Sequence, residues 1–103
     1  MIRGTTPTHY FDIKNNEINT SMLGKINVLY GQNDKLLFKK KTEDCKLENN
    51  TIITKLTREE SLKFDHKQPA QVQIVVETKN GDIIETVVMT IGVDKLLDDG
   101  ELE

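Results

Sequence analysis

The chain has 103 residues, of which 36% are hydrophobic and 30% charged, and its net charge is −3. This length predicts one domain with one modest core. We expect no membrane span, which needs roughly 18 uncharged apolar residues in a row, and no secretory signal, because the start lacks an apolar core. The single cysteine, Cys45, excludes an internal disulfide and fits folding in a reducing compartment.

The charge is unevenly distributed. Residues 94–103 (DKLLDDGELE) hold five acids and one lysine, a net charge of −4, so the remaining chain is close to neutral. A near-neutral body argues against nucleic acid as the main partner, because phosphate neutralisation needs concentrated Lys and Arg. We therefore divide the chain into an N-terminal arm at 1–7, a domain at 8–93 and an acidic C-terminal tail at 94–103.

The first half of the domain is predicted to be strands joined by polar turns. A plausible strand begins at 9–11, after an arm that contains Gly and Pro, whereas 14–22 has no period and is predicted to be a loop. Residues 25–31 alternate in the way that a half-buried strand requires. After a turn at 31–34, residues 35–41 should return as a strand with Leu36 and Phe38 facing inward and the lysines mostly outward.

The second half continues this pattern with one helical interruption. Residues 45–47 lead into a turn at 48–50, and 51–56 should form the next strand. Thr57 and Glu60 match a capping box, in which each side chain satisfies a backbone amide of the other residue. The short helical turn that follows should place Leu62 and Phe64 at one end of the core.

A hairpin is the clearest prediction in the chain, at residues 70–93. Asn80-Gly81 is typical of a two-residue type I′ turn, because both residues tolerate positive φ. That loop pairs Val76 with Glu85 and Val72 with Met89. It gives one apolar face made of Val72, Ile74, Val76, Ile83, Val87, Met89 and Ile91.

Short strands at intervals of about ten residues indicate an all-β fold. We predict a small antiparallel sandwich of the immunoglobulin-like type, or a related barrel, with one short helical turn.

Nothing in the sequence indicates catalytic chemistry, so we predict no catalytic residue, metal or cofactor. His9 and His66 lack metal-ligand partners at a useful spacing and are interpreted as structural or surface histidines. Cys45 follows acidic neighbours that would raise its thiol pKa, so we expect a small apolar residue and not a nucleophile. Glu59 and Glu60 point about 100° apart on a helix, so the helix cap explains them better than an acid–base pair.

Two regions remain as candidates for interaction. The basic cluster Lys39, Lys40 and Lys41 alternates between faces of its strand, which fits an edge protected by lysine better than a nucleic-acid patch. The chain ends either fray or lie along neighbouring subunits, and both readings stay open. The candidate interaction residues are Ile2, Arg3, Lys39, Lys40, Lys41, Leu96 and Leu97.

Four stretches carry a family resemblance: IRGTTPTH (2–9), TEDCKLENNTI (42–52), LTREESLKFD (56–65) and LLDDGEL (96–102). In this order they resemble short uncharacterised proteins encoded among the virion structural genes of tailed phages and prophages of Gram-positive bacteria. The sequence departs from that pattern at 14–17.

The resemblance implies a non-enzymatic virion structural or accessory protein, present in many copies on the capsid or the head–tail apparatus. Its partners would be other virion proteins and further copies of itself, and its location the virion and, during assembly, the host cytoplasm. The alternative is a prophage-encoded cytoplasmic module that binds a host protein through the strand at 35–41.

Overall fold

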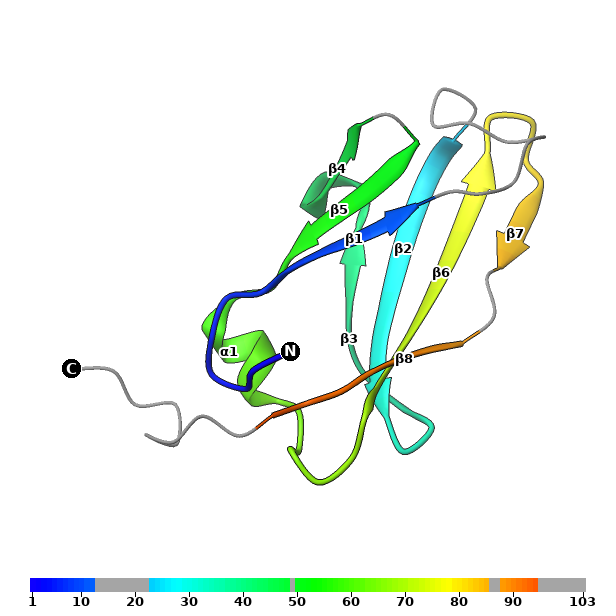
Figure 1. The fold of residues 1–103 in the computed structure, drawn as a ribbon. Coiled ribbons are helices and arrows are strands. Elements are labelled where there is room, and N and C mark those ends of the chain that lie inside the picture. The colour runs from blue at the N-terminus through cyan, green and yellow to red at the C-terminus, as the bar shows by residue number, and fades with distance from the viewer. Residues whose placement is uncertain (13–22, 49, 86–87, 95–103) are drawn as a thin grey trace.

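The fold consists of two antiparallel sheets and one short helix, which confirms the all-β prediction (Figure 1). Figure 1 shows a computed structural model that describes residues 1–12, 23–48, 50–85 and 88–94. The smaller sheet has the strand order β1-β5-β4, and the larger has β3-β2-β6-β7, with β8 also paired to β6. The elements are β1 (Thr8–Asp12), β2 (Leu23–Gln32), β3 (Lys35–Lys41), a 3₁₀ turn η2 (Thr42–Asp44), β4 (Cys45–Glu48), β5 (Thr51–Lys55), α1 (Arg58–Leu62), β6 (Ala70–Thr78), β7 (Ile83–Glu85) and β8 (Met89–Ile91).

Strands β2 and β6 form the centre of the core. Ile26, Val28 and Tyr30 of β2 lie opposite Val76, Ile74 and Val72 of β6, and all six are buried. Each strand points alternate side chains into the space between the sheets, as the sequence alternation predicts. The prediction of a strand at 25–31 is therefore confirmed.

The smaller sheet and the helix cover the inner face of this pair. The strands expected around 9–11 and 51–56 are β1 and β5. Ile52 of β5 is buried in the core, and Phe64, just after α1, closes one end of it, whereas Leu62 is only half-buried.

The predicted capping box at the start of α1 is confirmed. Thr57 Oγ1 accepts a hydrogen bond from the Glu60 amide at 3.1 Å, and Glu60 Oε1 accepts one from the Thr57 amide at 2.8 Å.

The hairpin between β6 and β7 corrects the predicted register by one residue. Val76 lies opposite Ile84 and not Glu85, so the loop holds three residues, with Gly81 at φ +89°. This is the three-residue hairpin loop whose last residue takes the left-handed conformation, and glycine suits that position. The slip exchanges the faces of β7, so Ile83 is 68% exposed and Ile84 packs against the core.

The register returns to the predicted one in β8. Val72 lies opposite Met89, as expected, and Met89 and Ile91 pack against the core. The pairing of β6 with β7 and that of β6 with β8 therefore differ in register by one residue. Val87, which was expected on the apolar face, lies outside the described residues, as does the whole of the predicted loop at 14–22.

A β-bulge in β3 overturns the inward placement of Leu36. Tyr30 lies opposite Phe38 but Gly31 lies opposite Leu36, so one extra residue is inserted in β3. Leu36 is consequently 59% exposed, and Leu37 packs against the core instead. The bulge brings the Lys35 carbonyl oxygen within 2.4 Å of the position that a Cβ on Gly31 would take, so only glycine fits there.

The start of the chain is joined to the last described residues. Ile2 forms a parallel bridge with Asp94, flanked by hydrogen bonds from Arg3 N to Asp94 O and from Asp94 N to Met1 O. The Met1 ammonium donates to Gly92 O at 2.9 Å.

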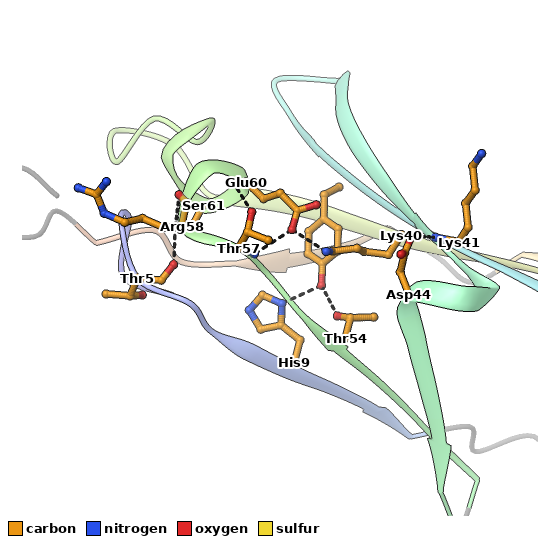
Figure 2. Close-up of polar contacts among 11 residues, drawn as sticks. Thr5, His9, Lys40, Lys41, Asp44, Thr54, Thr57, Arg58, Glu60 and Ser61 are labelled. Atoms are coloured by element: carbon orange, nitrogen blue, oxygen red, sulfur yellow. Dashed lines mark hydrogen bonds and ion pairs between the residues drawn. The ribbon is translucent and has the colours of Figure 1, made fainter. Parts of the chain in front are cut away.

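Ser61 in α1 fixes the same segment from the other side. Its Oγ is fully buried and accepts a hydrogen bond from Gly4 N at 3.1 Å. The same Oγ donates to Thr5 O at 2.6 Å (Figure 2). Arg3 Nε adds a bond of 2.8 Å to Phe64 O. The expected arm at 1–7 is thus bonded to its own domain over residues 1–5.

Candidate functional site

A polar cluster lies between the two sheets (Figure 2). The Tyr30 hydroxyl is 2.8 Å from His9 Nδ1 and 2.8 Å from Thr54 Oγ1. Tyr30 and Thr54 are fully buried, and the three residues come from β2, β1 and β5. These two hydrogen bonds therefore connect the smaller sheet to the larger one across the core.

Aromatic rings surround the Tyr30 side of this cluster. Tyr30 stacks on Phe38 with ring centroids 5.0 Å apart and meets the edge of Phe64 at 6.2 Å. Burial in this setting raises the pKa of Tyr30 far above its ordinary value, and the Thr54 hydrogen bond only partly opposes the shift. The phenol is therefore a neutral structural group at physiological pH.

His9 is held neutral in the same way. Burial lowers the pKa of His9, and the positive charge of the chain's amino terminus lowers it further. Its Nε2 is buried without a hydrogen-bond partner. The protonated ring would carry an N–H on both nitrogens, and the one on Nε2 would have no partner, which costs free energy.

An ion pair lies beside the Tyr30 cluster. Lys40 Nζ and Glu60 Oε1 are 2.5 Å apart, with side-chain exposures of 10% and 21%. Burial alone would raise the pKa of Glu60, but hydrogen bonds from Lys40 and from the Thr57 amide outweigh it and hold the pKa below its usual range. The pair ties β3 to α1.

Cys45 is half-buried at the start of β4. Burial raises the pKa of its thiol, and the Asp44 carboxylate raises it further. The acidic neighbours therefore raise the thiol pKa as predicted, but burial raises it more. A thiol with a raised pKa is a poor nucleophile.

The predicted interaction residues do not form one surface. Lys39 and Lys41 are exposed on β3, whereas Lys40 between them is buried against Glu60. Ile2 is 45% exposed at the joint of the chain ends, and Arg3 is half-buried beside it. Leu96 and Leu97 lie outside the described residues.

Sequence reasoning missed the contribution of Thr54. The sequence did contain a signal. Thr54 lies two residues after Ile52 in β5, and Tyr30 lies two residues after Val28 in β2, so the alternation of each strand points both side chains inward. Two polar side chains at inward positions of facing strands are expected to bond to each other. Strand pairing across the sandwich was needed to see that they meet.

Comparisons with known proteins add no assignment: no family model, no curated protein and no solved structure matches the chain. Within residues 1–12, 23–48, 50–85 and 88–94, no group of three or more His, Cys, Asp or Glu is placed to hold a metal ion. No helix in the described part of the chain is long and apolar enough to cross a membrane.

Proposed function

We propose that this protein is a non-enzymatic virion component of a tailed phage, bound in many copies to the capsid or the head–tail apparatus. The observation that carries the proposal is the resemblance of residues 2–9, 42–52, 56–65 and 96–102 to proteins encoded among virion structural genes. The protein would lie in the virion and, during assembly, in the host cytoplasm. Its partners would be capsid, neck or tail subunits and further copies of itself.

The use of the polar side chains supports this proposal. Tyr30, Thr54, Lys40 and Glu60 bond to one another or to neighbouring strands and hold the two sheets and the helix together. Their chemistry is thereby committed to the fold, which leaves the outer surfaces for function.

We further infer that the fold belongs to the immunoglobulin-like class of sandwiches. In such a fold, strands A, B, E and D form one sheet and C, F and G the other, to which the variable type adds C′ and C″; without A and C″, the orders are B-E-D and C′-C-F-G. The observed orders β1-β5-β4 and β3-β2-β6-β7 correspond to these, with α1 in the connection between the fifth and sixth strands.

The proposed mechanism is weak binding multiplied by repetition. Each copy would hold its site through a small surface, and neighbouring copies on a lattice would raise the local concentration of further contacts. Such a role needs a stable body with exposed faces and no reactive centre.

Mass spectrometry of purified particles tests the proposal. We expect the protein at a high copy number in washed particles and, in a map of the particle, as a small two-sheet density. Absence from particles of a phage that expresses the protein would refute it.

A truncation separates binding from folding. Deletion of 95–103 leaves the Asp94 bridge intact and should give a soluble folded protein with reduced incorporation. Deletion of 1–6 is unsuitable for this purpose, because it removes the bonds to Ser61 and Asp94. Normal incorporation of the 95–103 deletion would remove the tail from the proposal.

The second candidate function is a cytoplasmic module that binds a host protein. Strand β3 favours it, because β3 is an edge of the larger sheet in the described part of the chain and spans seven residues. An extended partner could pair with this edge. Absence from particles combined with stable co-purification of one host protein would favour this candidate over the first.

A further inference from the structure

The larger sheet has an outer face that points away from the core. Because Ile26, Val28 and Tyr30 point inward, Asn27 and Leu29 point outward. The register places Lys41, Asn27, Val75 and Glu85 side by side across the four strands β3, β2, β6 and β7. One row of this face thus runs from a lysine at one edge to a glutamate at the other.

The middle of the outer face is apolar. Leu29 and Val75 on the central strands β2 and β6 are half-buried there, and beside them Leu36 on the edge strand β3 and Val88 just before β8 are 59% and 51% exposed. A groove of about 240 Å³ on this face is lined mainly by apolar surface, including Leu29, Leu36 and Val88, with Gln71 and Gln73 beside them and Asp34 and Lys35 at the β2–β3 turn. Exposed large apolar side chains that share one groove indicate a contact surface more than isolated surface residues would.

Opposite charges flank this apolar centre. The β3 side carries the exposed Lys39 and Lys41, and the far side carries Glu85 on β7 and Glu77 on β6. Lys25 of β2 lies 3.9 Å from Glu77 and offsets part of that acidic charge. The face is therefore positive along β3 and negative along β7.

We propose that this outer face binds the same face of a second copy of the chain. The two-fold axis lies in the interface, parallel to the strands and between β2 and β6. Such an axis places β3 of one copy over β7 of the other, so that Lys41 of each copy meets Glu85 of its partner. An axis perpendicular to the strands would place lysine over lysine and glutamate over glutamate, which is unfavourable.

The charge pattern is what selects a second copy as the occupant. A two-fold interface uses one patch twice, so the patch must complement itself. A face with opposite charges on its two flanks and an apolar centre meets that condition. An unrelated partner would not require both charges on one face.

The size of the face predicts weak association. Four strands about 4.8 Å apart, over about seven residues of 3.3 Å each, give a face of roughly 400 Å². Two such faces would bury roughly 800 Å² in total, which is below the standard size and in the range of weak, transient interfaces. A reversible dimer at micromolar concentration follows, which a lattice of many copies would strengthen.

This inference does not depend on the virion proposal, since it concerns the purified protein alone. Analytical ultracentrifugation over a range of micromolar concentrations should show a concentration-dependent monomer–dimer equilibrium. A monomer at every concentration would overturn the inference and leave the proposed function untouched.

Two apolar variants test the location of the interface. Leu36→Glu should shift the dissociation constant at least tenfold towards monomer, because it replaces the most exposed apolar side chain of the groove with a charged one that must be desolvated on binding. Leu47→Glu is the matched control, because Leu47 is 38% exposed on β4 of the other sheet, and it should leave the equilibrium unchanged. Loss of the dimer in L47E with retention in L36E would overturn the proposed face.

A charge exchange tests the direction of the axis. Lys41→Glu and Glu85→Lys should each weaken the dimer, and the double variant should restore it. Lys67→Glu, at an exposed turn residue, is the control for net charge. If the double variant is no better than the single ones, the two-fold arrangement is overturned, and circular dichroism of each variant verifies that the fold is intact.

Discussion

Replacing Tyr30 with Phe should destabilise the protein through the loss of a single oxygen atom. The ring and its 5.0 Å stack on Phe38 remain, so no cavity is formed. Thr54 Oγ1, which is fully buried, and His9 Nδ1 both lose the partner that they now share. An unsatisfied buried polar group costs about 1–3 kcal/mol.

The two groups contribute unequally. Thr54 has no access to water and bears the full cost, whereas His9 is half-buried and bears less. We therefore expect Tyr30→Phe to lower the free energy of unfolding by about 2–3 kcal/mol, from a total of about 5–15 kcal/mol for a domain of this size. The melting temperature should fall by roughly 10–20 °C.

Urea unfolding near neutral pH measures the effect, and a double-mutant cycle identifies its cause. Thr54→Val alone should cost less than Y30F, because the Tyr30 hydroxyl keeps its bond to His9. The double variant should be more stable than the sum of the single effects implies, by about 1 kcal/mol, because the Tyr30 and Thr54 hydroxyls that bond to each other are then both absent and only the half-buried His9 loses a partner. A loss below about 0.5 kcal/mol in Y30F, or strict additivity, would refute the reasoning.

Three further predictions concern other parts of the fold. Because folding lowers the pKa of His9, the unfolded chain takes up a proton at a higher pH than the folded protein does. The free energy of unfolding should therefore keep its full value above the ordinary pKa of about 6.5 and decline as the pH falls below it. His9→Gln should remove this decline, measured by urea unfolding across pH, and His66→Gln should keep it. Ser61→Ala should cost about 1–3 kcal/mol and speed proteolysis of the N-terminal segment, because it removes that segment's buried hydroxyl partner; unchanged digestion would contradict this. Gly31→Ala should cost about 1–3 kcal/mol by thermal melting, whereas Gly92→Ala, where a Cβ meets nothing within 4 Å, should change stability by less than about 0.5 kcal/mol.

Local patterns in the sequence predicted the central elements well. The alternation of β2 and β6 depends only on which side chains are apolar, and the capping box of α1 depends on residues three apart. Both signals are read within a few residues, and the structure reproduces both.

The errors arose where backbone geometry inserts a residue. A glycine after an asparagine fits a two-residue loop as well as a three-residue one, and the choice moves Ile83 and Ile84 to opposite faces. In β3 the bulge beside Gly31 moved Leu36 outward for the same reason. A one-residue shift of register leaves the sequence pattern unchanged, but it decides which side chains are buried.

The polar contacts of the core could not be predicted from single segments. The alternation of β3 puts Lys40 on the same inward face as Phe38. Its partner Glu60, however, lies 20 residues further along the chain, in α1. The meeting of His9, Tyr30 and Thr54 likewise requires three strands from both sheets. Such contacts appear only once the sheets are laid against each other.

The bridge between Ile2 and Asp94 affects how the protein is made in the cell. Its two halves lie at opposite ends of the described chain, and β2 must also wait for β6 before the larger sheet can form. A nascent chain on the ribosome therefore cannot close this fold until Asp94 has been synthesised and has left the ribosome. Until then the unpaired strands are open to chaperones and to other growing chains.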